Sequence, residues 1–438
     1  MEYLRRRTPP EPEFHQAVTQ VLDHVISTAN ETDTLREHAI IERLTEPDRM
    51  IAFRVTWEDD NGDVQVNRGY RIQFNSAIGP YKGGLRFHPS VNPSVLKFLA
   101  FEQTFKNALT GLPMGGGKGG ADFDPKGRSD REIMRFCAAF MVELHRHIGP
   151  DTDVPAGDIN VGPREIGYLF GSYRRITNEF EGALTGKGLT YGGSELRVEA
   201  TGFGLLHFVC HMLGRANDAL DGKTVAVSGA GNVATHAAEK AIEMGAKVIT
   251  LSDSKGFIHD PDGVDKDKID WVRRLKSRPG ASLAAYADEF GAEWLEDGKP
   301  WCVPCDVALP CATQNELGLS DARQLLDNGC RLIAEGANMP LTKKALELVH
   351  DSRILLGPGK AANAGGVAVS GLEITQNQMR ASRTRGDISS ELHDIMKAIH
   401  DKCAEAGDGK DGYIDYSRGA DIAAFRKLAK AMLAQGIS

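Results

Sequence analysis

The segment Lys223-Thr-Val-Ala-Val-Ser-Gly-Ala-Gly-Asn-Val-Ala234 decides the fold class of the C-terminal half of this 438-residue chain. A short apolar run is followed at once by Gly229-Ala-Gly231-Asn-Val-Ala234 and then by a helical pattern. In such a turn the first glycine permits a tight bend, and the second lets the backbone approach a pyrophosphate at the positive end of the helix. A second apolar run, residues 246–252, leads into Asp253, where an acid can accept a ribose 2′-hydroxyl. We therefore expect a parallel sheet with a dinucleotide site; the alternative is a purely structural glycine turn in an unrelated α/β domain.

Short apolar runs elsewhere in the chain are typical of further strands. Two of them flank the Asn61-Gly62 turn, and three follow the dinucleotide turn and can extend its sheet. The glycine-dense segment 111–120 and the Asp-, Gly- and Pro-rich segment 151–162 are expected to be loops. The strand-like runs are residues 51–57, 68–74, 306–309, 332–334 and 354–356.

The pattern changes at the Gly192-Gly193 turn, which we take as a domain boundary. The expected fold class is α/β with two domains and a cleft between them. An N-terminal α/β domain for substrate binding and oligomerisation is expected at residues 1–192, and a Rossmann-type dinucleotide-binding domain at residues 193–412. A C-terminal helix at residues 413–438 is expected to pack back on the first domain.

The composition is that of an ordinary globular protein and argues against several function classes. A net charge of −8 disfavours a nucleic-acid or acidic-membrane partner, and no apolar run approaches the length of a membrane span. The arginines at residues 5–7 are followed by prolines and acids rather than by an apolar stretch, so no signal peptide is expected. The 7 cysteines form no disulfide framework, which favours a reducing cytoplasm.

Two short motifs suggest other chemistries, but their context argues against both. Gly117-Lys118 resembles part of a P-loop, yet Leu112 and Gly119 stand where that motif needs glycine and Ser or Thr. Cys302-Val-Pro-Cys305 resembles the redox motif of thioredoxins, yet a strand-like run follows it, so no helix dipole is expected to activate the first thiol. We expect buried or incidental thiols, and no metal site.

Two lysines of the N-terminal half stand in settings that suit anion binding. Lys82 lies in Gly79-Pro-Tyr-Lys-Gly-Gly-Leu-Arg86, where glycines bring the backbone close to whatever the lysine binds. Gln103 and Lys106 lie on one face of a helix that Asn92-Pro93-Ser94 can cap. Two lysine-bearing subsites suggest a dianionic substrate, although a solvated surface charge is the alternative for either lysine alone.

A third lysine, Lys118, is a candidate base. It stands among glycines at residues 115–120, where crowding by other cations and exclusion of water would lower its pKa. A neutral lysine can then take a proton from water or from a substrate amine. Asp158, in Pro155-Ala-Gly-Asp158, can complete a proton relay.

Longer motifs then carry a family resemblance over nearly the whole chain from Gln73 onward. They are Pro80-Tyr-Lys-Gly-Gly-Leu-Arg-Phe-His-Pro89, Phe101-Glu-Gln-Thr-Phe-Lys-Asn-Ala108, Leu112-Pro-Met-Gly-Gly-Gly-Lys-Gly119, Thr152-Asp-Val-Pro-Ala-Gly-Asp158, Leu309-Pro-Cys-Ala-Thr-Gln-Asn315, Ala334-Glu-Gly-Ala-Asn-Met-Pro340 and Lys360-Ala-Ala-Asn-Ala-Gly-Gly-Val367. Together they are similar to the hexameric glutamate dehydrogenases of the Glu/Leu/Phe/Val dehydrogenase superfamily. The chain length is similar to the short bacterial type, which lacks the antenna insertion of the animal enzymes.

The resemblance implies the reversible oxidative deamination of L-glutamate to 2-oxoglutarate and ammonia, with hydride transfer to a nicotinamide dinucleotide and no metal. Lys118 would activate the water that attacks the iminium intermediate, and Asp158 would move protons to and from the departing ammonia. Lys82 and Ser370 would hold the side-chain carboxylate. The other implied substrate contacts are Gly83, Arg197 and, for the α-carboxylate, Gln103 and Lys106; the implied cofactor contacts are Thr201, Gly229, Gly231, Asn232, Val233, Asp253, Ser254, Asn338 and Asn363. Val198 follows Arg197 where the family usually has proline, which leaves the shape of that loop open.

Two cofactors remain compatible with the sequence. Asp253 suits the ribose of NAD, whereas Leu251-Ser-Asp-Ser-Lys-Gly256 is similar to the version found in NADP-using bacterial members. Lys276 and Arg278 can hold a 2′-phosphate or can be solvated surface charges. We expect NADP, with NAD as the alternative.

Other functions are weighed against glutamate oxidation. Leucine, valine or phenylalanine would leave Lys82 desolvated without a counter-ion, which costs several kcal/mol. A non-catalytic, dinucleotide-binding regulator is the alternative from another class, and the presence of Lys118 and Asp158 argues against it. The resemblance also implies a cytoplasmic homohexamer that acts in amino-acid metabolism and nitrogen assimilation.

Overall fold

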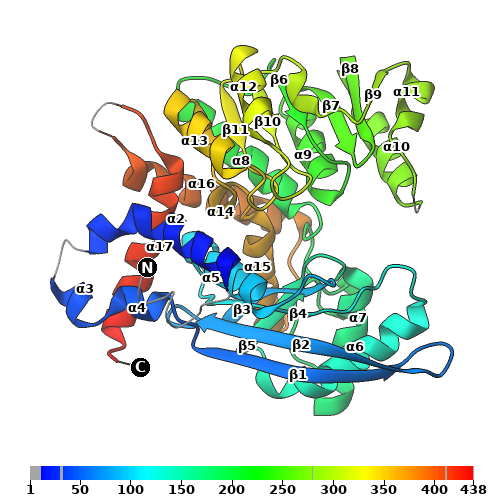
Figure 1. Ribbon diagram of the computed structural model, residues 1–438, viewed down its shortest axis with the longest axis vertical. Helices are drawn as coiled ribbons and strands as arrows, with labels where there is room; N and C mark the ends of the chain where they lie inside the picture. The colour runs from blue at the N-terminus through cyan, green and yellow to red at the C-terminus, as the bar shows by residue number, and fades with distance from the viewer. Residues whose placement is uncertain (1–10, 30–32, 279, 410–411, 438) are drawn as a thin grey trace. The chain divides into compact units, whose positions relative to one another are not determined.

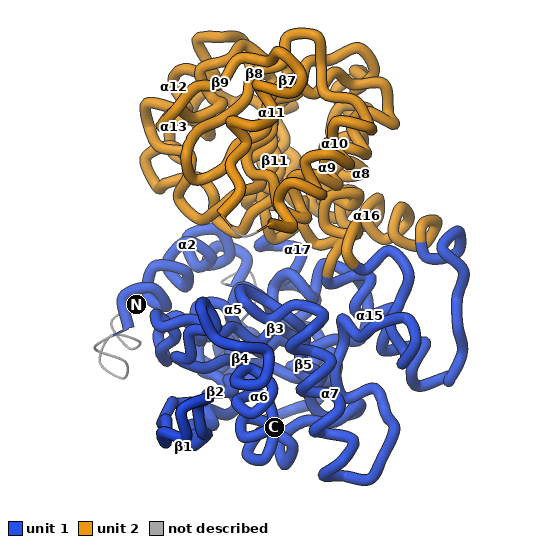
Figure 2. Tube along the Cα trace, turned by 90° about the vertical axis from the view of Figure 1, so that its right-hand side faces the viewer, with its two compact units in different colours: residues 1–197, 367–388, 421–438 blue, residues 198–366, 389–420 orange. Residues whose placement is uncertain are grey.

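The computed structural model describes residues 11–29, 33–278, 280–409 and 412–437, and the chain forms two compact units (Figure 2). The first unit comprises residues 1–197, 367–388 and 421–438, and the second comprises residues 198–366 and 389–420. Each unit contains one sheet with flanking helices, so the predicted α/β class is confirmed (Figure 1). The domain bounds expected from the sequence, at residues 192/193 and 412/413, stay a prediction.

The sheet of the first unit has a glycine-rich strand at its centre. Its order is β1-β2-β4-β3-β5, and the hairpin predicted around Asn61-Gly62 is β1 and β2. The loops predicted at residues 111–120 and 151–162 are wrong in part, because these segments contain β4 and β5. The strands are β1 (Arg49–Glu58), β2 (Val64–Asn75), β3 (Tyr81–Phe87), β4 (Gly116–Ala121) and β5 (Asp153–Gly157); β2 is antiparallel to β1 and β4, and β3 is parallel to β4 and β5.

Glycine occupies most positions of β4 because neighbouring elements leave no room for a side chain there. Helix α5 (Pro93–Thr110) packs directly on this strand, and a Cβ added to Gly116 would lie 1.9 Å from Thr104 Oγ1. A Cβ added to Gly119 would lie 2.7 Å from the carbonyl oxygen of Tyr70 on β2. Glycine normally weakens a strand, so composition alone indicates a loop. The close approach of neighbouring elements, which a local pattern does not reveal, explains the strand.

Helices cover both faces of this sheet. On one face α2 (Pro12–Ala29) and α5 pack through aromatic side chains, with the rings of Phe14 on α2 and Phe101 on α5 edge to face at 6.1 Å. On the other face α6 (Asp130–Leu144) and α7 (Pro163–Thr177) bury a cluster that includes Phe87 and Phe136. The remaining helices are α3 (Asp33–Glu37), α4 (Ile40–Leu44), and α15 (Gly365–Met379) and α17 (Tyr416–Ala434), which both begin in the second unit and continue in the first.

The second unit has the topology expected around the dinucleotide turn. Its sheet has the order β12-β11-β10-β6-β7-β8-β9, parallel from β12 to β7 and antiparallel beyond. The strand order reverses at β6, which lies between β7 and β10, and ligands bind at such switch points in open parallel sheets. All the predicted runs are strands: β6 (Thr224–Val227), β7 (Lys247–Asp253), β10 (Val307–Leu309), β11 (Leu332–Ala334) and β12 (Leu355–Gly357).

The remaining elements of the second unit are its helices and two strands at one edge of the sheet. Strands β8 (Gly256–Val264) and β9 (Glu293–Glu296), which the sequence pattern did not reveal, form that edge. No helix within the described ranges is both long enough and apolar enough to span a membrane. The helices are α8 (Ala200–Arg215), α9 (Asn232–Glu243), α10 (Lys266–Lys276), α11 (Ala284–Phe290), α12 (Leu319–Asp327), α13 (Lys343–Ser352), α14 (Gly359–Ala362) and α16 (Arg385–Gly407).

The Cys302–Cys305 motif has no helix after it. Cys302 ends the 3₁₀ turn η3 (Pro300–Cys302), and β10 follows the second cysteine as predicted. Hydrogen bonding to Cys330, together with burial, raises the pKa of the Cys305 thiol. A strand rather than a helix follows the motif, so the first thiol, Cys302, lacks the helix N-terminus that activates a redox-active cysteine.

A group of histidines lies between α8 and α16 in the second unit. His207 Nδ1 is 3.3 Å from His393 Nδ1, and the ring centres of His211 and His400 are 5.6 Å apart. His400 Nε2 is 3.0 Å from the Tyr416 hydroxyl oxygen. Burial lowers the pKa of His207 to about 3 and that of His211 to about 4, and it also lowers the pKa of His400. The rings of His207, His211 and His400 are therefore neutral in the folded protein at neutral pH.

We expect this histidine group to make the second unit sensitive to acid. Below pH ~6.5 the unfolded chain binds protons that the folded histidines do not, so stability falls as pH decreases toward the folded pKa values. Each such histidine contributes a slope of about 1.4 kcal/mol per pH unit in that range. His207→Phe should move the pH of half-unfolding, followed by circular dichroism, to a lower value. The exposed His350→Gln serves as the control, and an unchanged midpoint for His207→Phe would contradict this account.

Candidate active site

A lysine and an aspartate from two strands of the first unit are in direct contact. Lys118 lies within β4, and Asp158 follows directly after β5. Lys118 Nζ donates to Asp158 Oδ1 at 2.8 Å, and Arg86 Nε, near the end of β3, donates to Asp158 Oδ2 at 2.6 Å. Because β3 runs parallel to both β4 and β5, the carboxyl ends of these strands lie together. The two residues predicted to carry the proton chemistry are thus neighbours.

Burial and charge set the protonation states of this pair. Burial lowers the pKa of Lys118; the Asp158 carboxylate opposes this effect, and the positive charges of Arg86 and Arg71 add to it. Burial by itself raises the pKa of Asp158, but Lys118 and Arg86 outweigh it and hold that pKa well below its usual value. Lys118 therefore loses its proton more readily than an ordinary lysine, while Asp158 stays ionised. Such a pair is suited to proton transfer.

A second lysine, Lys82 on β3, is enclosed in the same unit. It is 1% exposed, and its Nζ donates to Thr185 Oγ1 at 2.8 Å. Burial lowers the pKa of Lys82 well below its usual value, with the charge of Arg197 adding to the effect and Glu373 opposing it. Two buried donors, Ser370 Oγ and Arg197 Nε, have no hydrogen-bond partner in the part of the chain that the structure describes. Since an unmet buried donor costs about 1–3 kcal/mol, these groups are suited to bind a carboxylate.

Helix α5 brings two further polar side chains over β3 and β4. Gln103 and Lys106, three residues apart, are both half-buried on this helix. A Cβ added to Gly83 on β3 would lie 3.2 Å from Gln103 Cγ and 1.7 Å from the carbonyl oxygen of Gly117. Glycine at position 83 therefore allows both α5 and β4 to approach β3. Gln103 Nε2 donates to Asn107 Oδ1 at 2.7 Å, which fixes its orientation.

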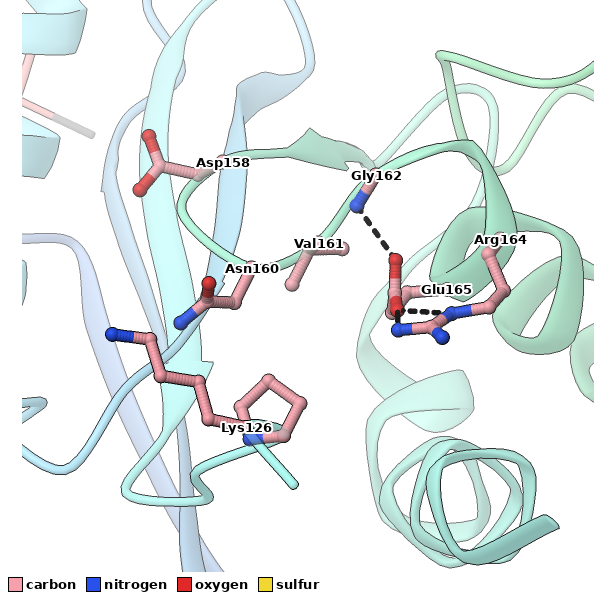
Figure 3. Close-up of a pocket in the computed structure, with 8 residues that line it drawn as sticks. Lys126, Asp158, Asn160, Val161, Gly162, Arg164 and Glu165 are labelled. Carbon is pink, nitrogen blue, oxygen red and sulfur yellow. Dashed lines mark hydrogen bonds and ion pairs between the residues drawn. The ribbon is translucent and has the colours of Figure 1, made fainter. Parts of the chain in front are cut away.

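A cavity of about 390 Å³ borders Asp158 (Figure 3). The loop from Asp158 to Gly162 lines it and leads into α7, where Gly162 N donates to Glu165 Oε2 at 2.8 Å. Lys126 and Arg164 add positive charge to the lining, and Arg164 is bonded to Glu165.

In the second unit the predicted dinucleotide turn joins β6 to α9. Gly229 has φ +88° and its N–H donates to Ser252 Oγ at 2.8 Å, so the tight bend is present. Gly231 precedes α9 as its N-cap, and among the described residues no atom beyond its two chain neighbours lies within 4 Å of the position that a Cβ would take there. Packing within the protein therefore does not require this glycine. The open space before Asn232 and Val233, at the helix N-terminus, fits the close approach of a pyrophosphate.

Three other predicted cofactor contacts lie in the same unit. Asn338 follows β11 and Asn363 follows β12 and α14, and Asn363 Nδ2 donates to Asn338 Oδ1 at 3.1 Å. Thr201 stands in the first turn of α8, which packs closely on α9. A Cβ added to Gly202 would lie only 2.5 Å from Ala237 N. The structure thus brings Asn338 and Asn363 together and places Thr201 next to the helix that starts at the dinucleotide turn.

Asp253, at the end of β7, is already engaged by groups of its own unit. Its Oδ2 accepts from Leu283 N at 2.8 Å and from Lys276 Nζ at 3.1 Å, and its Oδ1 accepts from Lys255 N at 2.9 Å. Burial raises the pKa of Asp253, but these bonds outweigh it and lower the pKa overall. Lys276 therefore brings positive charge to the position that distinguishes a ribose 2′-hydroxyl from a 2′-phosphate. Ser254 is exposed in the same turn.

Comparison with known families accounts for both units. The family described as Glutamate/Leucine/Phenylalanine/Valine dehydrogenase matches residues 192–436, and the Glu/Leu/Phe/Val dehydrogenase, dimerisation domain, matches residues 47–175. The chain belongs to the Glu/Leu/Phe/Val dehydrogenase family. The family resemblance predicted from the sequence motifs is therefore confirmed.

Relatives within the Glu/Leu/Phe/Val dehydrogenase family match the chain from end to end. The NAD-specific glutamate dehydrogenase of Bacteroides fragilis is 56% identical over 438 residues, covering 100% of this chain and 98% of the relative. The NADP-specific glutamate dehydrogenase of Salmonella typhimurium is 54% identical over 437 residues, with the same coverage of 100% and 98%. A solved glutamate dehydrogenase structure is 50% identical with a TM-score of 0.98, covering 100% of this chain and 98% of that one.

The predicted site residues of this family member divide cleanly between the two units. Those predicted to contact substrate or move protons all lie in the first unit, and those predicted to contact the cofactor all lie in the second. The first set is Lys82, Gly83, Gln103, Lys106, Lys118, Asp158, Arg197 and Ser370, and the second is Thr201, Gly229, Gly231, Asn232, Val233, Asp253, Ser254, Asn338 and Asn363.

Sequence reasoning missed the groups that hold the lysines in place. Glu373 on α15 accepts from Lys187 Nζ at 2.7 Å and from Gly186 N at 2.9 Å, and so fixes the segment that carries Thr185. Arg86, the partner of Asp158, lies inside the motif at residues 80–89 and could have been singled out there. Thr185 and Glu373 stand in no comparable pattern, and only the folded chain brings them to Lys82.

Proposed function

We propose that this chain catalyses the reversible oxidative deamination of L-glutamate to 2-oxoglutarate and ammonia, with NADP favoured over NAD. The observation that carries the proposal is the enclosed cationic site around Lys82, in the same unit as the Lys118–Asp158 pair. Relatives named glutamate dehydrogenase, more than half identical over the full chain, support it.

Glutamate carries two carboxylates, and the first unit offers two cationic subsites. Lys82, Arg197 and Ser370 are suited to the side-chain carboxylate, because each has hydrogen-bonding capacity that the described residues leave unused. Gln103 and Lys106 are suited to the α-carboxylate. Leucine, valine or phenylalanine would press hydrocarbon against the buried Lys82 cation, at a cost of several kcal/mol. Glutamate is therefore the family substrate that this site fits.

Lys118 and Asp158 divide the proton transfers between them. When bound, the nicotinamide supplies the acceptor for the hydride of glutamate Cα. Neutral Lys118 then takes a proton from the water that adds to the iminium carbon of the oxidised substrate. Asp158, ionised and bonded to Lys118, accepts this proton from Lys118 and passes it to the amine that leaves as ammonia, while Arg86 holds its carboxylate in place. The reverse sequence assimilates ammonia.

The preference for NADP is tested at Lys276. Lys276→Ala removes the positive charge beside Asp253 and leaves that carboxylate to repel a 2′-phosphate. We expect the KM for NADP to rise about tenfold and the KM for NAD to change little, because a charge-assisted bond to phosphate is lost. Steady-state kinetics with both dinucleotides measure this, with the exposed Lys266→Ala as the control. Equal changes with the two dinucleotides would contradict the assignment.

We also propose that the enzyme is a homohexamer in the cytoplasm. The match of residues 47–175 to a dimerisation domain and the motifs similar to hexameric members support assembly. The 7 cysteines are all free thiols, which fits a reducing compartment. Light scattering of the purified protein measures the number of subunits.

The function itself is tested by following the oxidation of NADPH and NADH side by side with purified protein, 2-oxoglutarate and ammonia. Oxidation that needs both substrates supports the proposal, and the ratio of the two kcat/KM values gives the cofactor preference. No oxidation of either dinucleotide, with dinucleotide binding intact, would favour the non-catalytic regulator instead.

A further inference from the structure

Arg71 on β2 is a buried arginine to which the proton transfers above assign no role. It is 0% exposed and forms a fork with Asp153 at the start of β5, with Nε donating to Oδ2 at 2.8 Å and Nη2 donating to Oδ1 at 2.5 Å. Nη1 donates to the carbonyl oxygen of Gly83 on β3 at 3.0 Å. Gln73 Nε2 also donates to Asp153 Oδ2, at 3.0 Å. A single side chain therefore ties β2, β3 and β5 together.

To reach Asp153, Arg71 crosses β4 directly behind Lys118. The strand order is β2-β4-β3-β5, and the register pairs Arg71 with Gly119 and Ile72 with Lys118. Side chains alternate along a strand, so Arg71 and Lys118 point to opposite faces of the sheet. A Cβ added to Gly119 would lie 3.0 Å from Arg71 Cδ, and one added to Gly117 would lie 3.4 Å from Arg71 Nη2. The glycines on either side of Lys118 thus leave the path that Arg71 takes.

The guanidinium of Arg71 therefore places a permanent positive charge on the face of β4 opposite to the Lys118 side chain. After burial, which has the largest effect, Arg86 and Arg71 both lower the pKa of Lys118 against the opposing charge of Asp158. A guanidinium does not lose its proton, and this one is held at both ends by buried partners. The elements packed around Lys118 carry charges of both signs. These are Asp153 on β5 and Asp158 after it, Lys82 and Arg86 on β3, Arg68 and Arg71 on β2, and Lys97, Glu102 and Lys106 on α5.

We propose that Arg71, held by Asp153, is a positioning residue for Lys118. Arg71 fixes β4 from the face opposite to the Lys118 side chain and keeps a positive charge on that face, near the reacting ammonium group. The inference rests on the proposed function, because it gives Arg71 a part in the same proton transfer. A purely structural clamp would change stability alone. A positioning cation also sets the pH at which Lys118 becomes a base.

The test is the pH profile of kcat/KM for glutamate oxidation in three variants and the wild type. Arg71→Met/Asp153→Asn removes both charges without leaving a buried ion unpaired. Arg71 lies against Gly117 and Gly119 of β4, whereas Asp153 lies two strands away on β5. Loss of the nearer positive charge therefore outweighs loss of the negative one, and the acid limb of the kcat/KM profile should move to higher pH by about half a unit. Arg71→Lys keeps the charge but loses the fork, so the limb should stay while kcat falls roughly tenfold. Lys97→Met on α5, which breaks the ion pair of Lys97 with Glu11, should change neither the acid limb nor kcat.

Each outcome decides the matter. A folded double variant whose acid limb stays at the wild-type pH would overturn the inference, and so would full turnover in Arg71→Lys. If the double variant does not fold, Arg71→Lys decides alone. An acid limb at the wild-type pH together with a lowered kcat supports the inference, and a wild-type kcat overturns it. If the wild type itself shows no glutamate-dependent reduction of NADP or NAD, the proposed function fails and the inference falls with it.

Discussion

Lys118→Ala will lower kcat for glutamate oxidation roughly a thousandfold, the order of effect expected when a positioned general base is removed. Lys118 is 4% exposed and its Nζ bonds to Asp158, so no other group on β4 can replace it. The fold should persist, because Asp158 keeps its bond to Arg86. Stopped-flow or steady-state rates measure the loss, and circular dichroism and dinucleotide binding by calorimetry show that the rest of the molecule is intact.

Lys118→Arg is the matched variant for this prediction. It retains the positive charge and the ion pair, but a guanidinium does not lose a proton at accessible pH. We therefore expect Lys118→Arg to be nearly as inactive as Lys118→Ala. If either variant turned over at near wild-type rates with wild-type pH dependence, Lys118 would not be the base.

Lys82→Leu will change the preferred substrate of the enzyme from glutamate to apolar amino acids. The variant leaves the side-chain carboxylate of glutamate without its buried cation, so kcat/KM for glutamate should fall roughly a hundred- to a thousandfold. An apolar amino acid such as norleucine should gain, because it no longer meets an uncompensated charge. Kinetics with glutamate and norleucine, run in parallel, measure the change in selectivity.

A neighbouring buried lysine provides the control for Lys82→Leu. Lys187 is paired with Glu373 at 2.7 Å, with both side chains almost fully enclosed. Lys187→Leu should destabilise the protein by leaving Glu373 unpaired, but it should not favour apolar substrates. Unchanged selectivity in Lys82→Leu, or the same exchange of substrate in Lys187→Leu, would contradict the assignment of Lys82 to the side-chain carboxylate.

The sequence predicted those features that local patterns encode. The strand, the glycine turn and the helix around Gly229 and Gly231 obey short-range rules, and the structure has all three. The buried parallel strands β10, β11 and β12 were also visible as short apolar runs. The predicted loop that became β4 shows the limit, since glycine composition indicates irregular backbone unless the close approach of Thr104 and Tyr70 is known.

The supports of the candidate site could not be predicted because they join distant parts of the chain. Arg71 and Asp153 are 82 residues apart, and Lys187 and Glu373 are 186 apart. No periodicity links such positions, and each residue alone looks like an ordinary surface charge. Glycines around Lys82 and Lys118 mark these lysines in the sequence. The hydrogen bond from Lys82 to Thr185 depends instead on a segment that Glu373 and the carbonyl oxygen of Pro155 hold in place.

The central claim is that this chain moves a hydride between glutamate Cα and a nicotinamide. The most direct test is to incubate the purified enzyme with L-glutamate deuterated at Cα and NADP, and to analyse the reduced dinucleotide by mass spectrometry. The account predicts that the NADPH formed carries the deuterium, in amounts equal to the 2-oxoglutarate released. Release of the deuterium to solvent, or 2-oxoglutarate formed without labelled NADPH or NADH, would contradict it.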